Sequence, residues 1–271
     1  MIDYIKPIKK GILFALTPKR LLPMLALDIF FFALFIIFVF SNLPNFISAL
    51  LVVVVDPTSA SALIGDILFP IFLFLFLLVV WGLLRLMITG VMIHQSYRET
   101  TYRKSFNLVI NRYPSLLLAS IMITIVTGIL NVIPYVGGIL SLIAGIAFFF
   151  YMQFVILEKT GGIEALESSF SYFRRTPLEI FFMWILITLI SLMIGLLFSI
   201  PLFLMIWPSI SSLFAQSMNS NIVMASIILV LLKNSYILAI GGSLSAVGLS
   251  VSTVFSLKSQ TEYYKILKRQ H

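Results

Sequence analysis

Six long apolar segments dominate this chain of 271 residues. A helix needs roughly 20 consecutive apolar residues to cross the hydrocarbon core of a bilayer. The segments reach about that length and do not alternate apolar and polar residues, which favours helices over the strands of a membrane barrel. The sequence therefore predicts an all-α, polytopic membrane bundle. The predicted spans are about Leu21–Phe40, Ile67–Ile93, Ser115–Ile133, Gly137–Leu157, Leu178–Ile200 and Tyr236–Leu257.

The composition requires lipid as the solvent for these segments. The chain is 61% hydrophobic and 10% charged, with a mean hydropathy of +1.12. Soluble domains are roughly 45–50% apolar and about 25% charged, so a soluble protein would have no way to bury so much apolar surface. The first span is expected to be an uncleaved signal anchor, because no A-x-A cleavage signal follows it. The chain contains no cysteine, which excludes disulfides and thiolate metal sites.

The basic residues predict the orientation. Most of the 18 lysine and arginine residues lie before span one, between spans two and three, between spans four and five, or after span six. The opposite loops contain neither residue type; they are Ser41–Asp66, Val132–Val136 and Pro201–Asn221. Because cytoplasmic loops are enriched in lysine and arginine, we predict an integral plasma (cytoplasmic) membrane protein with both termini cytoplasmic.

A basic stretch with helical amphipathic spacing precedes three of the apolar segments. The stretches are Ile5–Arg20, Tyr102–Arg112 and Ile163–Arg175. Such spacing is typical of a helix that lies flat on a membrane surface. A proline lies near the end of each stretch and disfavours helix in the residue before it. We therefore predict corners at Pro18, Pro114 and Pro177, where an elbow helix ends and a span begins.

The predicted organisation is a single domain, residues 1–271, built from three elbow-plus-hairpin units at about 1–95, 96–158 and 159–271. The outer segment Asn42–Val55 is interrupted by Pro44 and is expected to lie flat or to dip into the membrane. A short outer helix is expected around Ile222–Leu232. Lys233-Asn234 or Gly241-Gly242 is expected to break the long segment before span six.

The text from Asn131 to Pro177 resembles a superfamily of uncharacterised six-span archaeal and bacterial membrane proteins. These proteins resemble the membrane domain attached to some glycerophosphodiester phosphodiesterases. The matching positions are Glu158, Gly161, Gly162, Ala165, Leu166, Ser169, Phe170, Arg174 and Arg175. The resemblance implies a six-span fold. It does not imply phosphodiesterase activity, since the catalytic domain is not present.

A second, shorter resemblance is to the sulfate permease family that supplies cysteine biosynthesis. Ile12–Asp28 is similar to the opening elbow of that family, and Ile133–Gly137 is similar to its turn between spans. The resemblance implies transport of a small anion. The chain departs from that family in its six full spans and in the text after Pro177.

Asp28 and Arg85 are the candidate intramembrane ion pair. Each lies seven or eight residues inside the cytoplasmic end of its predicted span, so at 1.5 Å per residue both sit roughly 10–12 Å deep. Charges at such depth are costly and are usually paired or functional. We expect a structural salt bridge, with an anion or proton site at Arg85 as the alternative.

Two predicted spans carry stripes of small residues at helical spacing, which let helices approach closely. The residues are Gly137, Ser141 and Gly145 in the fourth span and Gly241, Ser245 and Gly248 in the sixth. We expect packing within the chain, with dimerisation or a hydrophilic path as alternatives. Basic corner residues are expected to contact anionic lipid headgroups. They are Lys19, Arg20, Arg112, Arg174 and Arg175.

No pattern in the sequence predicts catalysis, a cofactor, a metal site or nucleic-acid binding. HExxH, P-loop and GxGxxG motifs are missing, and Ser243 and Ser245 lack the context of a nucleophile elbow. The predicted function is therefore a non-enzymatic membrane scaffold or accessory subunit that contacts membrane lipids, with a homo-oligomeric or membrane-complex partner. The alternative is a small-anion (sulfate-like) or solute permease or channel. An intramembrane enzyme would need several polar residues at one depth.

Overall fold

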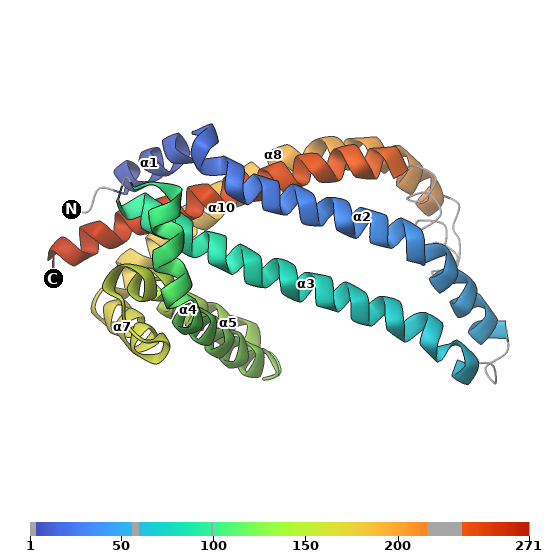
Figure 1. Cartoon of the computed structure of the whole chain (residues 1–271), viewed down its shortest axis with the longest axis horizontal. Coiled ribbons are helices and arrows are strands. Elements are labelled where there is room, and N and C mark those ends of the chain that lie inside the picture. Colours follow the sequence, from blue (N-terminus) through green and yellow to red (C-terminus); the bar gives the residue numbers. More distant parts are fainter. Residues whose placement is uncertain (1–3, 56–59, 99, 216–234, 271) are drawn as a thin grey trace. The chain divides into compact units, whose positions relative to one another are not determined.

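The computed structural model describes residues 4–55, 60–98, 100–215 and 235–270, and every regular element in these ranges is a helix (Figure 1). The predicted all-α fold class is confirmed. The elements are α1 (Ile5–Ala15), α2 (Pro18–Val55), α3 (Ala60–Tyr97), α4 (Tyr102–Asn131), α5 (Gly137–Ala147), α6 (Tyr151–Gln153), the π-helix η2 (Phe154–Glu158), α7 (Gly162–Arg175), α8 (Pro177–Ala215) and α10 (Ser235–Gln270).

The described residues contain six helical stretches that are long and apolar enough to cross a membrane, as predicted. They are Pro18–Asn42, Leu68–Tyr97, Tyr102–Asn131, Gly137–Glu158, Pro177–Met205 and Ala239–Gln270. The chain is therefore a multi-pass membrane protein. Its six predicted spans match these stretches in order, although several boundaries differ.

Four of the helices are longer than a span requires. α2, α3, α8 and α10 contain 36 to 39 residues each, which corresponds to about 54–58 Å of helix. The hydrocarbon core is only about 30 Å thick, so each of these helices extends beyond it. Because α10 is longer than a span requires, the charged residues near its C-terminal end are also helical.

α2 is continuous at Pro44, and Gly241-Gly242, one of two alternative breaks predicted before span six, does not break α10. Proline and glycine are tolerated within membrane helices, because neighbouring groups satisfy the freed backbone atoms. The predicted outer helix Ile222–Leu232 and the pair Lys233-Asn234 lie outside the described residues.

Two of the three predicted corners are confirmed. α1 ends shortly before Pro18, and α7 ends at Arg175, where Thr176 leaves the helical conformation before α8 begins at Pro177. The corner at Pro114 is wrong, because α4 continues through it. Tertiary packing explains the difference: the buried face of α4 extends across Pro114 without a break. The buried residues on this face are Ser105, Val109, Leu116 and Ala119.

The chain forms two compact units. Unit 1 comprises Met1–Met24, Leu83–Ile194 and Ser250–His271, and unit 2 comprises Leu25–Gly82 and Gly195–Leu249. The boundaries between the units fall inside α2, α3, α8 and α10. The predicted single domain with three repeated units remains a prediction.

Unit 2 packs through aromatic rings between α2 and α3. The centroid of the Phe35 ring lies 5.4 Å from that of Phe74 and 6.3 Å from that of Trp81, and Phe38 and Phe74 are 5.7 Å apart. Aromatic pairs at these separations contribute beyond the area they bury. They hold the two apolar helices of this hairpin together.

Unit 1 is built around the hairpin of α4 and α5, against which α7 packs (Figure 1). Tyr135 adopts a left-handed conformation in the hairpin turn, with φ of 64°. At the start of α7, a Cβ at position 162 would lie 2.8 Å from the carbonyl oxygen of Ser115 in α4. Only glycine fits there, so Gly162 fixes how closely α7 approaches α4.

Candidate functional site

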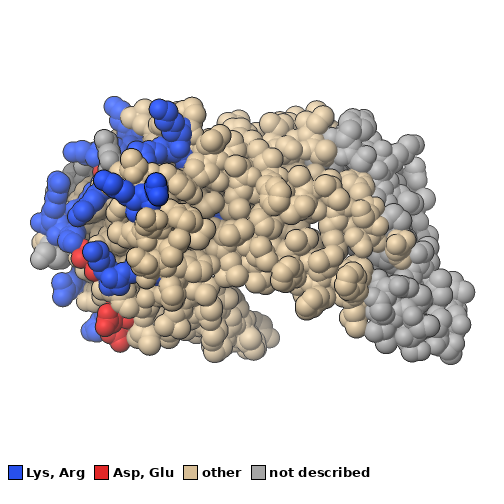
Figure 2. Space-filling model, viewed as in Figure 1, with Lys and Arg blue, Asp and Glu red and all other residues tan. Residues whose placement is uncertain are grey.

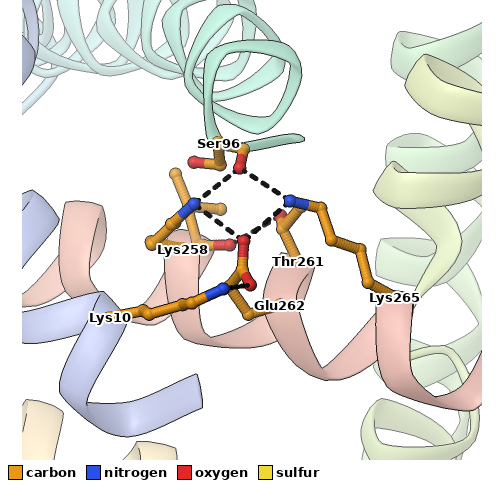
Figure 3. Close-up of polar contacts among 7 residues, drawn as sticks. Lys10, Ser96, Lys258, Thr261, Glu262 and Lys265 are labelled. Carbon is orange, nitrogen blue, oxygen red and sulfur yellow. Dashed lines mark hydrogen bonds and ion pairs between the residues drawn. The ribbon is translucent and has the colours of Figure 1, made fainter. Parts of the chain in front are cut away.

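Glu262, near the end of α10, lies at the centre of a charged cluster (Figure 3). Its side chain is only 8% exposed. Oε2 accepts a hydrogen bond from Nζ of Lys10 at 2.7 Å. Oε1 accepts from Nζ of Lys258 at 2.8 Å and from Nζ of Lys265 at 2.7 Å. One carboxylate thus binds three ammonium groups and ties α1 to α10.

The cluster also includes the end of α3. The carbonyl oxygen of Ser96 accepts hydrogen bonds from Nζ of Lys258 at 2.7 Å and of Lys265 at 3.3 Å (Figure 3). The last carbonyl groups of a helix lack partners within it and carry partial negative charge. The two lysines satisfy this end of α3, so the cluster joins α1, α3 and α10.

The local sequence explains most of this geometry. Lys258 and Lys265 lie four residues before and three residues after Glu262, and such positions are neighbours on a helix surface. Lys10 is brought in by tertiary packing. The next residue, Gly11, approaches α10 so closely that a Cβ there would lie 2.0 Å from Oγ of Ser259.

Aromatic rings stabilise the positive charge that Glu262 leaves uncompensated. Nζ of Lys265 lies 4.9 Å from the ring centroid of Tyr97, and Nζ of Lys258 lies 5.3 Å from that of Phe14. The guanidinium of Arg20 also lies over the Phe14 ring, at 5.7 Å. Such contacts attract a cation to the negative face of the ring.

A second carboxylate, Glu158 at the end of η2, forms a similar link to α10. Its Oε1 accepts a hydrogen bond from the hydroxyl of Tyr264 at 2.7 Å and another from Nζ of Lys268. The Tyr264 ring is fully buried and packs against Phe154 and Tyr172, with centroids 5.3 and 6.2 Å away. This contact holds η2 and α7 against the end of α10.

The fourth span is interrupted, and Ser169 of α7 closes the interruption. The regular helix stops at Ala147 and resumes at Tyr151. The hydroxyl of Ser169 accepts from the backbone N–H of Phe150 at 3.1 Å and donates to the carbonyl of Ala147 at 3.0 Å. The side chain of Gln260 donates to the carbonyl of Phe149. The predicted span Gly137–Leu157 is confirmed as the stretch Gly137–Glu158, and the structure adds an interruption of the regular helix between Ala147 and Tyr151.

Tyr4, the residue before α1, packs against α10. The ring of Tyr4 stacks on that of Tyr263, with centroids 6.1 Å apart. Burial and then the carboxylate of Glu179 raise the pKa of the Tyr4 phenol. Tyr4 therefore stays neutral near pH 7 and contributes packing instead of charge.

The structure places the predicted pair Asp28 and Arg85 in different units. In unit 2, Asp28 is 3% exposed, and its Oδ1 accepts a hydrogen bond from Nε1 of Trp81 at 3.1 Å. In unit 1, Nη2 of Arg85 donates to Oγ1 of Thr253 at 2.8 Å. Both side chains therefore have neutral partners within their own units, and the salt bridge between them remains a prediction.

The small-residue stripe of α10 lies against α8 within unit 2. A Cβ at Gly241 would lie 2.4 Å from the side chain of Leu202, and one at Gly248 would lie 2.6 Å from Cβ of Phe198. Ser245 bonds to the carbonyl of Gly241 at 2.9 Å.

The stripe of the fourth span does not form one continuous contact among the described residues. A Cβ at Gly137 would lie 2.4 Å from the carbonyl oxygen of Leu130, and Ser141 accepts a hydrogen bond from Asn131 at 3.2 Å. A Cβ at Gly145 would meet nothing within 4 Å. The close approach at Gly137 and the hydrogen bond of Ser141 lie within the hairpin of α4 and α5, whereas Gly145 faces open space.

The predicted basic corners have different surroundings. Nη1 of Arg112 donates to the carbonyl of Lys159 at 2.8 Å, and Arg20 lies over the Phe14 ring. Lys19 is exposed, as are Arg174 and Arg175 at the end of α7. Whether these side chains meet lipid headgroups remains a prediction.

Sequence reasoning missed Glu262, Glu158 and Ser169 as organising residues. A signal for Glu262 is present, because Lys258 and Lys265 flank it at helical spacing. For Glu158 and Ser169, the informative contacts come from Lys268 and from the backbone at Ala147 and Phe150. No local pattern indicates those partners.

The fold and this arrangement define a multi-pass α-helical membrane protein with charged clusters that join helix ends. In the part of the chain that the structure describes, no three His, Asp or Glu residues lie close enough to hold a metal ion. No family model matches the chain, and neither a curated protein nor a solved structure matches it. The two family resemblances therefore remain predictions.

Proposed function

We propose that this membrane protein is a non-enzymatic scaffold or accessory subunit whose working surface is the basic surface of unit 1. This surface consists of the exposed lysine and arginine side chains of that unit. They are Lys6, Lys9, Lys10, Lys19, Arg98, Arg103, Lys104, Lys159, Arg174, Arg175, Lys268 and Arg269. The lysine and arginine side chains that face the viewer are blue in Figure 2.

The observation that carries the proposal is that the ionisable groups of unit 1 include two sets: carboxylates in structural contacts, and exposed lysine and arginine residues. The carboxylates of Glu262 and Glu158 are bound in structural contacts that join helix ends. Among the described residues of the unit, the exposed lysine and arginine side chains outnumber the exposed carboxylates, which are Glu164 and Glu167. A surface with excess positive charge is suited to bind anionic lipid headgroups, and each basic residue near the membrane contributes about 1 kcal/mol.

The proposal places both termini and the basic surface on the cytoplasmic side of the plasma membrane, which the absence of native cysteine makes simple to test. Lys9→Cys and Lys104→Cys report on the basic surface, and Tyr135→Cys reports on the turn between α4 and α5. In intact cells, a membrane-impermeant maleimide is expected to label Tyr135→Cys alone. The other two variants should react only after permeabilisation. The reverse pattern would contradict the orientation.

Lipid retention and flux, measured on one preparation, test the function. The purified protein is expected to retain anionic phospholipid in preference to phosphatidylcholine, as seen by mass spectrometry of the intact complex. Raising the salt concentration should weaken this preference, because salt screens exposed charges. Proteoliposomes containing the protein should release sulfate and other oxyanions no faster than empty vesicles.

The polar contacts of Asp28 and Arg85 within candidate spans favour a small-anion or solute permease as the second candidate. This function requires sulfate or solute flux above that of empty vesicles. It also requires that Asp28→Asn changes the flux while assembly stays normal. Such a result would replace the scaffold proposal. Equal flux through the native protein and Asp28→Asn would exclude a role for Asp28 in transport.

A further inference from the structure

A groove of about 460 Å³ runs along α7 of unit 1. Its lining residues follow one another at helical spacing on a single face: Glu167, Phe170, Ser171, Arg174 and Arg175. Residues three and four positions apart on a helix are neighbours, so this face presents one carboxylate, one ring, one hydroxyl and two guanidinium groups together.

The charges of this α7 groove are not used by the fold. Among the described residues, the side chains of Glu167, Arg174 and Arg175 form no ion pair or hydrogen bond. Lys258 and Lys265, by contrast, are bound to Glu262. The α7 groove therefore keeps three charged side chains available to a ligand.

The chain fixes the level of the α7 groove relative to the membrane. Arg175 is two residues before Pro177, where the candidate span Pro177–Met205 begins. Two residues of extended chain reach at most about 7 Å. The guanidinium groups of Arg174 and Arg175 therefore lie within reach of lipid headgroups, and the half-exposed Phe170 ring adds an apolar surface beside them.

The pattern of charge selects among headgroups. Two cations and one anion on α7 complement two anions and one cation on the ligand. Guanidinium groups bind phosphate and carboxylate oxygens with paired hydrogen bonds. A headgroup with a phosphate, a carboxylate and a primary ammonium provides this complement, whereas a phosphoglycerol headgroup offers no cation to Glu167.

We propose that the α7 groove binds the headgroup of an anionic phospholipid that carries a primary ammonium, as phosphatidylserine does. Arg174 and Arg175 bind its phosphate and carboxylate, and Glu167 binds its ammonium. The inference rests on the proposed function, since it names the lipid class and the residues for one part of the basic surface.

The test compares the binding of phosphatidylserine and phosphatidylglycerol to the full-length protein in phosphatidylcholine nanodiscs. The native protein is expected to prefer phosphatidylserine. Replacing both arginines (Arg174→Gln with Arg175→Gln) should weaken its binding about 30-fold, given the usual contribution of two basic residues at a membrane surface. The matched double variant Arg103→Gln with Lys104→Gln, on α4 outside the groove, should weaken the binding of phosphatidylserine and phosphatidylglycerol alike and so preserve the preference for phosphatidylserine.

Glu167→Gln separates headgroup recognition from general attraction and from folding defects. It keeps both arginines, and the proposal expects it to bind the two anionic lipids equally. Continued preference for phosphatidylserine in this variant would overturn the proposal, as would unchanged binding after loss of both arginines.

Equal binding of both lipids by the native protein would reject the α7 groove while leaving the proposed function intact. If the native protein bound neither anionic lipid in preference to phosphatidylcholine, the proposed function itself would be rejected. Binding of soluble glycerophosphoserine as tight as that of the lipid would also overturn the assignment to a membrane ligand.

Discussion

Glu262→Gln is expected to lower the free energy of unfolding by about 3 kcal/mol, because removing one partner of a buried charged group leaves the others uncompensated. The carboxylate is 8% exposed and binds Lys10, Lys258 and Lys265. Glutamine keeps the size and one acceptor oxygen but not the charge, so three ammonium groups would remain close together. Unfolding of the purified protein in detergent measures the change.

The matched control is Glu167→Gln, which makes the same chemical change on the exposed face of α7. Its effect on stability should stay within about 0.5 kcal/mol, as for most surface substitutions. A second signature is structural: hydrogen exchange at the end of α10 and in α1 should increase in Glu262→Gln. Equal stability of the two variants would show that the cluster does not hold α1, α3 and α10 together.

Ser169→Ala is expected to destabilise the protein by about 2–4 kcal/mol. The substitution leaves the backbone N–H of Phe150 and the carbonyl of Ala147 without their side-chain partner, and each buried unsatisfied group costs about 1–3 kcal/mol. The loss should be local at first. Hydrogen exchange of the Phe150 amide is the most specific measurement, since that N–H donates directly to Ser169.

The neighbouring variant Ser168→Ala provides the control. Ser168 lies on the same helix and is half-buried, and its side chain forms no hydrogen bond with the residues that the structure describes. It should unfold with nearly native stability and leave exchange at Phe150 unchanged. If both serine variants behave alike, the interruption of the fourth span does not depend on the hydroxyl of Ser169.

The spans could be predicted from the sequence because membrane insertion depends on local properties. Length and apolarity alone identify a helix that crosses lipid, and the stretches from Pro18 to Asn42 and from Pro177 to Met205 satisfy both conditions. The corners at Pro18 and Pro177 were also predictable, because proline restricts the residue before it. Pro114 shows the limit of that rule, since continuous burial along α4 keeps the helix intact.

The end of α10 was harder to predict, because its structure depends on distant segments. As sequence, Lys258–Arg269 has the composition of a charged tail that follows a span. In the structure it is helical, with Tyr263, Tyr264 and Leu267 fully buried. Its charges are satisfied by Lys10 and by the carbonyl of Ser96, more than 150 positions away in the chain. Periodicity within the tail does not identify such partners.

The same distinction applies to the candidate functional surfaces. The basic residues of α7 were predicted because Arg174 and Arg175 precede an apolar segment. The α7 groove was not predicted, because it depends on Glu167 and Phe170 sharing one exposed helix face with the arginines, and that exposure is known only from the structure. Charge placement along the chain thus predicted a basic corner at Arg174 and Arg175, whereas the proposal of a particular headgroup required the folded helix.

The most direct test of the proposed scaffold function is the paired measurement of lipid retention and anion flux on one reconstituted preparation. The account predicts retention of anionic phospholipid that weakens as salt increases, together with sulfate release no faster than from empty vesicles. Sulfate release that exceeds the empty-vesicle rate and changes in Asp28→Asn, without preferential retention of anionic lipid, would contradict it.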